Sequence, residues 1–281
     1  MLGSVPATRS LLPSGLPCWV ELATADENAA QAFYGGLFGW TYRAIRHPAT
    51  RNGRYLLASL DDADVGGLYL AEPGQRSAWT INVAVRNTIN AAEWVEHLGG
   101  EVTRAPVSIP HHGSILRASD PGGTPVVFWQ PPETWDFASG EPNTFSGADL
   151  NTRDGTAADH FFCRLFNYTA VQIGDHHGID YMEWRLGNQP VLYRYVMGPE
   201  YPPDTPPHWM VYFQVHPDRG TDAATEHALL LGGSVVVNPY DTPWGRIAIL
   251  ADPAGATFSI IDHSVTLDDW GRAEVDDPYD D

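Results

Sequence analysis

A segment of this chain recurs 128 residues later, and this internal repeat constrains the fold more strongly than any other feature of the sequence. Residues 19–40 (WVELATADENAAQAFYGGLFGW) align without a gap to residues 147–168 (GADLNTRDGTAADHFFCRLFNY). The identical residues are Leu22, Thr24, Asp26, Ala29, Ala30, Phe33, Leu37 and Phe38, which recur as Leu150, Thr152, Asp154, Ala157, Ala158, Phe161, Leu165 and Phe166. Such a repeat predicts an architecture built from copies of one unit.

The local pattern of the first copy predicts a strand, a helix and three further strands. Residues 17–23 have the pattern of a strand, and Asp26 is a suitable helix N-cap. Apolar residues then follow at i, i+3 and i+4 spacing until Gly39, which should end the helix. Turn residues separate three strand-like segments near 41–47, 54–60 and 65–71.

The same order of elements recurs three more times. A second unit begins with a strand at 78–85, and the third begins with a strand at 144–151. The turns DPGG at 120–123 and DPAG at 252–255 relate the second and fourth units. We therefore predict an α+β fold of four βαβββ modules in two pairs.

The segment between the repeats is rich in proline, glycine and acidic residues, which is typical of a domain boundary. It divides the chain into two predicted domains of two modules each. The predicted parts are a flexible N-terminal segment 1–16, a first domain 17–131, a linker 132–143, a second domain 144–263 and an acidic tail 264–281.

Acidic residues outnumber basic residues by 35 to 16, which gives a formal net charge of −19. This charge repels nucleic-acid phosphates and anionic lipid, so we expect neither a nucleic-acid nor a membrane partner. Solubility explains the acidic surface, and attraction of cationic ligands is the alternative.

Targeting and cysteine patterns favour the cytoplasm. No apolar run approaches the roughly 18 residues that cross a bilayer, and the N-terminal segment lacks the apolar core of a secretory signal. Cys18 and Cys163 lie in different repeats without a metal-binding spacing. We expect a cytoplasmic monomer or homodimer.

The motif D-x-x-A-A-x-x-F-Y-x-x-L-F-G-W at 26–40, together with the D-P-x-G turns, resembles the vicinal oxygen chelate superfamily. That superfamily includes glyoxalase I, bleomycin-resistance proteins and extradiol dioxygenases, and its tandem-duplicated subtype is the nearest likeness. The resemblance extends over roughly residues 17–262. It implies that two modules lie edge to edge and form a cup around a small ligand. The four modules would then form two open, cup-shaped mixed sheets flanked by helices, and the two predicted domains would each be glyoxalase-like.

The resemblance also implies where a divalent metal would bind, because enzymes of this superfamily use His and Glu from the first and last strands of each module. Counting from the helix caps and D-P turns, those positions are Trp19, Thr80, Val127, Gly147, Met210 and Ser259. None is a His or Glu, so we predict no metal and no other cofactor. A site rebuilt from His111-His112, His176-His177 or His208 remains an alternative.

Alternation along the first strand identifies two candidate catalytic carboxylates. Trp19, Glu21 and Ala23 share the face opposite to the helix and should point into the cup. The repeat makes Asp149 the counterpart of Glu21. A carboxylate on an aromatic surface can act as a general acid or base, whereas a solvated carboxylate at the rim is the alternative.

The same alternation identifies residues that should contact a ligand. The candidates are Trp19, Asn82, Val127, Trp129, Asn151, Tyr193, Tyr195, Met210, Tyr212, Gln214 and Ser259. Aromatic rings with a few amides suit a flat, partly apolar molecule, although any one of these aromatic residues could instead belong to the core.

Two classes of function follow from these residues and from the resemblance. The first is a metal-independent enzyme that modifies a partly aromatic or polyketide-like metabolite by carboxylate acid–base catalysis. The second is a non-catalytic protein that binds or sequesters a small molecule or drug. A metal-dependent lyase or dioxygenase is disfavoured. The two halves differ at inward positions, which predicts that one cup is the principal working site.

Overall fold

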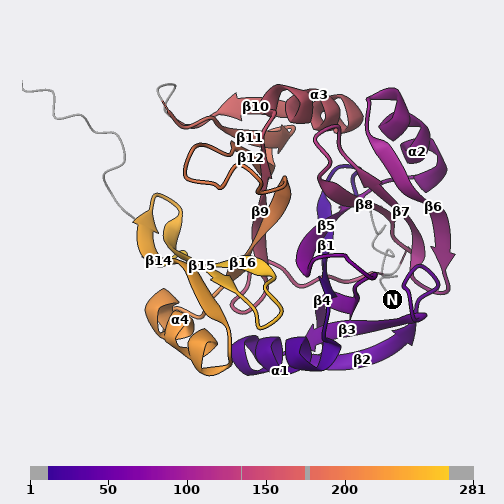
Figure 1. The fold of residues 1–281 in the computed structure, drawn as a ribbon. Coiled ribbons are helices and arrows are strands. Elements are labelled where there is room, and N and C mark those ends of the chain that lie inside the picture. The colour runs from indigo at the N-terminus through magenta and orange to yellow at the C-terminus, as the bar shows by residue number, and fades with distance from the viewer. Residues whose placement is uncertain (1–11, 134, 175–177, 266–281) are drawn as a thin grey trace, which may run out of the picture.

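The computed structural model describes residues 12–133, 135–174 and 178–265 (Figure 1). The described chain forms two mixed eight-stranded sheets and four helices, which confirms the predicted α+β fold. Most of the predicted flexible segment 1–16, the acidic tail beyond residue 265 and the pair His176-His177 lie outside the described residues.

The first sheet is built from the N-terminal half of the chain. Its helices are α1 (Glu27–Phe38) and α2 (Thr88–His97). Its strands are β1 (Pro17–Thr24), β2 (Thr41–Arg46), β3 (Arg54–Leu60), β4 (Ala63–Leu70), β5 (Ala78–Ala84), β6 (Glu101–Ile109), β7 (Gly113–Ser119) and β8 (Pro125–Gln130).

The second sheet is built from the C-terminal half. Its helices are α3 (Gly155–Phe166) and α4 (Gly220–Leu230). Its strands are β9 (Phe145–Thr152), β10 (Thr169–Gln172), β11 (Tyr181–Leu186), β12 (Gln189–Val196), β13 (His208–Gln214), β14 (Ser234–Thr242), β15 (Gly245–Ala251) and β16 (Thr257–Asp262).

The two sheets have the same strand topology. The first has the order β2-β3-β4-β1-β5-β8-β7-β6, and the second has the order β10-β11-β12-β9-β13-β16-β15-β14. The central pair of each sheet is antiparallel, β1 with β5 and β9 with β13, and it joins two βαβββ modules edge to edge. The predicted four modules and their pairing are therefore confirmed.

Local chemistry sets the ends of the helices that follow the repeated strands. The Asp26 side chain accepts hydrogen bonds from the backbone N–H groups of Asn28 and Ala29, at 2.9 and 3.0 Å. Gly39 ends α1 in the left-handed region, at φ 79°. Asn167 holds the equivalent position after α3 at φ 57°, because asparagine tolerates this conformation better than most residues.

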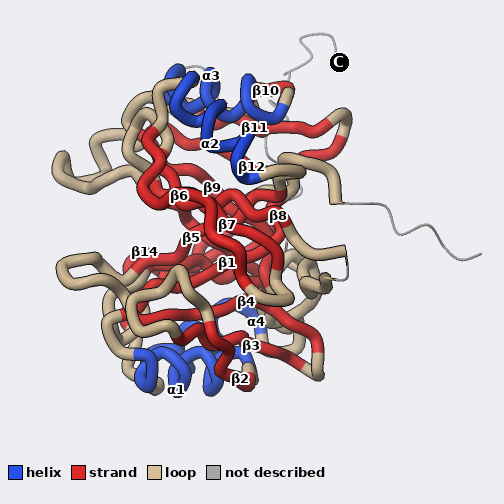
Figure 2. The backbone as a smooth tube through the Cα atoms, turned by 90° about the vertical axis from the view of Figure 1, so that its right-hand side faces the viewer, coloured by secondary structure: helices blue, strands red, loops and turns tan. Residues whose placement is uncertain are grey.

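One hydrophobic core is shared by the two halves. It contains the helices and the convex faces of both sheets, with Phe33 of α1 packed on Phe258 of β16 and Trp79 of β5 packed on Phe213 of β13. Figures 1 and 2 show α1 beside α4 and α2 beside α3. The concave faces of the sheets are therefore directed away from this core. No described helix is both long and apolar enough to span a membrane.

Candidate functional site

The concave face of the second sheet holds an open cavity of about 440 Å³. Alternation along β9 positions its floor, because Ala148 and Leu150 are buried in the shared core while Gly147, Asp149 and Asn151 face the cavity. We call this space the second cup. Its volume lies within the range of roughly 300–1,000 Å³ that is usual for small-molecule sites.

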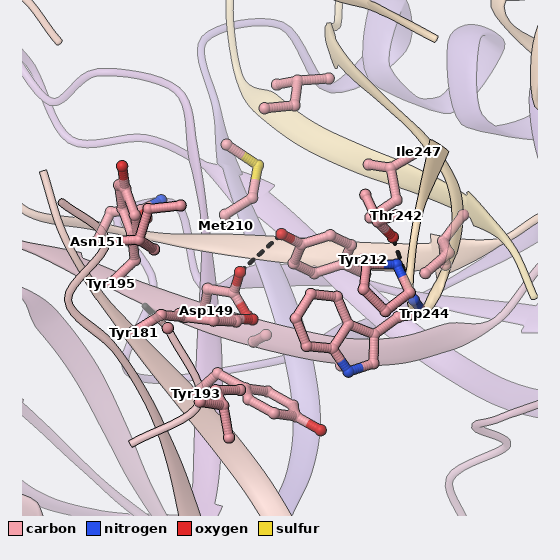
Figure 3. Close-up of a pocket in the computed structure, with 18 of the residues that line it drawn as sticks. Asp149, Asn151, Tyr181, Tyr193, Tyr195, Met210, Tyr212, Thr242, Trp244 and Ile247 are labelled. Carbon is pink, nitrogen blue, oxygen red and sulfur yellow. Dashed lines mark hydrogen bonds between the residues drawn. The ribbon is translucent and has the colours of Figure 1, made fainter. Parts of the chain in front are cut away.

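Aromatic side chains form most of the wall of the second cup (Figure 3). They come from strands β11 to β14 and from two connections between strands. The aromatic lining residues are Tyr181, Tyr193, Tyr195, Tyr201, Tyr212, Tyr240 and Trp244. Met210, Ile247, Ile249 and Ile261 complete the apolar surface. Flat, partly apolar molecules match a surface of this composition.

Asp149 is the central polar group of this surface. Its residue is only 8% exposed, and its two carboxylate oxygens accept hydrogen bonds from different tyrosines. Tyr212 Oη donates to Oδ2 at 2.7 Å, and Tyr181 Oη donates to Oδ1 at 3.2 Å. Burial raises the pKa of Asp149 to about 6, although the two hydroxyl donors act to lower it. The group can therefore take up or release a proton near neutral pH.

The tyrosines around Asp149 remain hydrogen-bond donors at neutral pH. Burial raises the pKa of Tyr212 and Tyr181 well above the ordinary tyrosine value, and the neighbouring carboxylate raises it further. A phenol with a raised pKa keeps its proton, so both hydroxyls stabilise the ionised form of Asp149.

The first cup, on the concave face of the first sheet, is nearly filled by aromatic side chains and retains only about 50 Å³. Trp19 of β1 packs against Trp129 of β8, with ring centroids 5.9 Å apart. Trp135 and Phe137 follow β8 and lie over Trp19, with ring centroids 6.2 and 5.5 Å from that of Trp19. The segment between the two sheets thus closes the first cup with its own rings.

The carboxylate of the first cup is already neutralised by the protein. Glu21 forms a buried ion pair with Arg117 of β7, whose guanidinium lies 4.8 Å from the centre of the Tyr69 ring. Tyr55 Oη also donates to Glu21, at 3.3 Å. Glu21 therefore has its charge and its hydrogen bonds satisfied without a ligand.

Strand registers show which residues correspond in the two cups. Trp19 lies opposite Asn82 as Gly147 lies opposite Tyr212, so Gly147 stands where the first cup has a tryptophan. Arg117 lies opposite Val127, and Ile249 lies opposite Ser259. Both Arg117 and Ile249 stand three positions before a D-P turn, so Ile249 replaces the internal cation.

Comparison with known proteins decides the family. The chain is 31% identical over 264 residues to the anthracycline biosynthesis protein DnrV of Streptomyces peucetius, which covers 88% of this chain and 93% of the relative. It is 32% identical over 271 residues to CFP32 of Mycobacterium tuberculosis, a protein named glyoxylase, which covers 90% and 97%. This chain belongs to the vicinal oxygen chelate superfamily. No protein-family model matches it.

Solved structures of this superfamily share the fold at low sequence identity. The Mn(II)-bound glyoxalase of Novosphingobium aromaticivorans has a TM-score of 0.61 at 17% identity, over 92% of this chain and 85% of that one. The 2,3-dioxygenase LapB of Pseudomonas sp. KL28 has a TM-score of 0.63 at 14% identity, over 89% and 93%.

The residues at the superfamily's metal positions do not fit a divalent ion. The register corrects two of the positions expected from the sequence, because Thr80 and Met210 lie opposite Glu21 and Asp149. The strand neighbours at the expected sites are Trp19, Asn82 and Val127 in the first cup and Gly147, Tyr212 and Ser259 in the second. None of these is a His or a carboxylate. Within the described ranges, no group of three or more His, Cys, Asp and Glu could hold a metal ion.

The predicted ligand-contacting residues divide between the first cup, the second cup and positions outside the cavity. Trp19, Asn82, Val127 and Trp129 belong to the filled first cup. Asn151, Tyr193, Tyr195, Met210 and Tyr212 line the second cup.

Gln214 and Ser259 are not brought to the cavity. A register shift after Tyr212 places Gln214 beyond the end of the cavity. The backbone of Gln214 forms hydrogen bonds with the backbone of Asn143 and Thr144. Ser259 is fully buried and donates its hydroxyl to the Ala248 carbonyl at 3.1 Å.

Sequence reasoning missed part of the wall of the second cup. Tyr201 and Trp244 lie in connections between strands, where alternation gives no orientation. Tyr240 lies on β14, whose pairing with β15 has two register shifts. The abundance of aromatic residues near these turns was the only available signal.

Proposed function

We propose that this protein is a metal-independent enzyme of secondary metabolism that binds a flat, partly aromatic metabolite in the second cup. Asp149 is the group that moves a proton. The single observation that carries this proposal is a carboxylate with a pKa of about 6 at the floor of an open aromatic cavity. Groups with perturbed pKa values in clefts are candidates for catalysis.

The relatives support the class of substrate. DnrV and DauV are named for anthracycline biosynthesis, and anthracyclines are built on flat polycyclic ring systems. The aromatic wall of the second cup offers stacking surfaces for such a ring system, because aromatic pairs favour offset or edge contacts. A polyketide-like metabolite therefore matches both the cavity and the names of the relatives.

The chemistry available to this chain is a proton transfer at the buried carboxylate of Asp149. The ionised carboxylate of Asp149 accepts a proton from one atom of the substrate, and the protonated group returns it to another atom. Hydrogen bonds from Tyr212 and Tyr181 hold the carboxylate in place during both steps. The aromatic walls orient the ring of the bound molecule, which is the second contribution to the rate.

The experiment is turnover of anthracycline-type polyketide intermediates by the wild type and by Asp149→Asn. We expect the variant to lose about 100-fold or more of kcat, in line with general acid–base catalysis. Tyr212→Phe removes a hydrogen bond that lowers the Asp149 pKa, so the midpoint of the pH–rate profile should move above 6. Asp64→Asn, beside the first cup, is the control and should not change turnover. Unchanged turnover in Asp149→Asn would refute the acid–base role.

A second candidate function is binding without chemistry. The two tyrosine hydroxyls on Asp149 and the open aromatic wall would also serve a protein that sequesters its ligand. Recovery of a bound polyketide unaltered after long incubation with the wild type would favour this function. For either function we propose a cytoplasmic monomer or homodimer that contacts neither nucleic acid nor membrane.

A further inference from the structure

The second cup contains a buried carboxylate without an internal counter-ion. Within the described chain, Asp149 forms no ion pair, and no basic group contributes to its pKa. Apart from the tyrosines, the titratable residues among the described lining of the cavity are Asp149, Glu200 at the exposed rim, and His263, whose ring nitrogens contact Ser146 and the Trp244 carbonyl. No lysine or arginine belongs to that lining. A buried charge without a counter-ion raises the free energy of the folded protein. A cation that enters this cavity and pairs with Asp149 would lower it.

The first cup shows what such a cation would contact. There the guanidinium of Arg117 hydrogen-bonds to Glu21 and lies over the ring of Tyr69. Strand registers give both Glu21 and Tyr69 a counterpart in the second cup. Tyr69 lies opposite Ala23 as Tyr195 lies opposite Asn151, so Tyr195 corresponds to Tyr69.

Only the cation itself lacks a counterpart. Ile249 stands at the position of Arg117, is half-buried and lines the cavity. The carboxylate and the aromatic ring are therefore retained in the second cup, while the arginine that would occupy the space between them is replaced by a shorter, uncharged side chain.

We propose that the ligand of the second cup carries a protonated amine, which occupies the place that the Arg117 guanidinium takes in the first cup. The inference rests on the proposed function only in requiring that a small molecule enters the second cup. An ammonium there has a carboxylate partner and electron-rich aromatic faces, the two environments that stabilise organic cations in proteins. The net charge of −19 also favours its approach.

Asp149 can serve an ammonium and a reacting proton at the same time. An ionised carboxylate offers about four lone-pair positions, and the tyrosines Tyr181 and Tyr212 use one on each oxygen. One remaining position can accept an N–H of the ligand, and the other stays available for proton transfer.

The test uses three probes that share one fluorescent ring system and differ in charge. They are 9-(aminomethyl)anthracene, 9-anthracenemethanol and 9-anthracenecarboxylate, titrated at pH 7.5. We expect the ammonium probe to bind at least about tenfold more tightly than the alcohol, in line with a cation that is partly desolvated beside aromatic rings and a carboxylate. The carboxylate probe should bind more weakly than the alcohol.

Two variants assign the preference to named residues. Asp149→Asn should abolish the advantage of the ammonium probe and leave the affinity for the alcohol nearly unchanged. Ile249→Arg places the guanidinium of the first cup in the second and should exclude the ammonium probe, while Ile249→Met is the control for side-chain size. If Ile249→Arg does not fold, Asp149→Asn alone decides the question.

The outcomes separate this inference from the proposed function. Equal affinity for the ammonium and the alcohol, or an ammonium preference that survives in Asp149→Asn, would refute the amine while keeping the second cup as a binding site. Absence of binding by all three probes, together with no binding of anthracycline-type compounds, would refute the second cup itself as a ligand site.

Discussion

The two cups share a strand order, a carboxylate and a tyrosine that donates to it, yet one is filled and the other is open. Trp19 and Arg117 occupy the first cup, and Gly147 and Ile249 stand at the same places in the second. A cavity of about 440 Å³ remains in the second cup, against about 50 Å³ in the first. These two positions, together with Trp135 and Phe137 over the first cup, distinguish the filled cup from the open one.

The two sheets use their concave faces differently. The first cup uses inward-facing side chains for packing, and Trp135 and Phe137 from the connection to the second sheet cover it. The second cup keeps its polar centre but gives up packing, which leaves Asp149 exposed to a ligand. A buried carboxylate without a counter-ion is costly, so the retention of Asp149 at an open site favours a role in binding or chemistry.

The largest expected effect concerns the ion pair of the first cup. Arg117→Met leaves Glu21 buried without a counter-ion, and this should lower the free energy of unfolding by about 3–5 kcal/mol. Urea unfolding at pH 7.5 measures the change. The double variant Glu21→Gln/Arg117→Met removes both charges and should recover most of the loss. Ile249→Met in the second cup should cost no more than about 1 kcal/mol. If Arg117→Met lost as little stability as Ile249→Met, Glu21 would not depend on Arg117 as its counter-ion, and the two cups would not differ in this respect.

The next effect concerns the open space of the second cup. Gly147→Trp introduces the ring that fills the first cup, and a Cβ added at Gly147 meets no atom within 4 Å. We expect the fold to be retained. The affinity for the anthracene probes should fall at least about 100-fold, which is about 2.7 kcal/mol of binding free energy. Gly147→Ala is the matched control and should bind nearly as the wild type does. Wild-type affinity in Gly147→Trp would show that the ligand binds elsewhere.

The third effect is a pH dependence of stability. The pKa of Asp149 is raised from 3.8 to about 6 by burial, so the folded state binds its proton more tightly than the unfolded state does. The stability that this proton contributes is present below pH 4 and is lost as the pH rises through 6. Asp149→Asn should therefore match the wild type near pH 4 and exceed it at pH 7.5 by on the order of 3 kcal/mol.

Urea unfolding of both proteins across this pH range provides the measurement. A variant that is less stable than the wild type at pH 7.5 would mean that the charge of Asp149 is compensated inside the folded protein. The second cup would then resemble the first, and the contrast between Asp149 and Glu21 would fail.

The repeat and its capping residues were sufficient to predict the fold. Asp26, Gly39 and the helical stripe act through contacts between residues close in the chain, so their effects can be inferred from spacing alone. Alternation along the repeated strand also predicted that Glu21 and Asp149 face the concave sides, because side-chain direction in a strand has a period of two. The prediction that Gln214 faces the cavity was wrong, because a register shift precedes this residue in β13.

By itself, the sequence determined four βαβββ modules and one inward carboxylate on each repeated strand, since these follow from local periodicity and from the repeat, and the family resemblance added the two cups. Only the tertiary structure decided which cup is open. That outcome depends on contacts between distant residues: Arg117 reaches Glu21 across 96 positions, and Trp135 comes from a segment without regular alternation. Local spacing does not specify such contacts, because they form when the strands pair and the sheet curves.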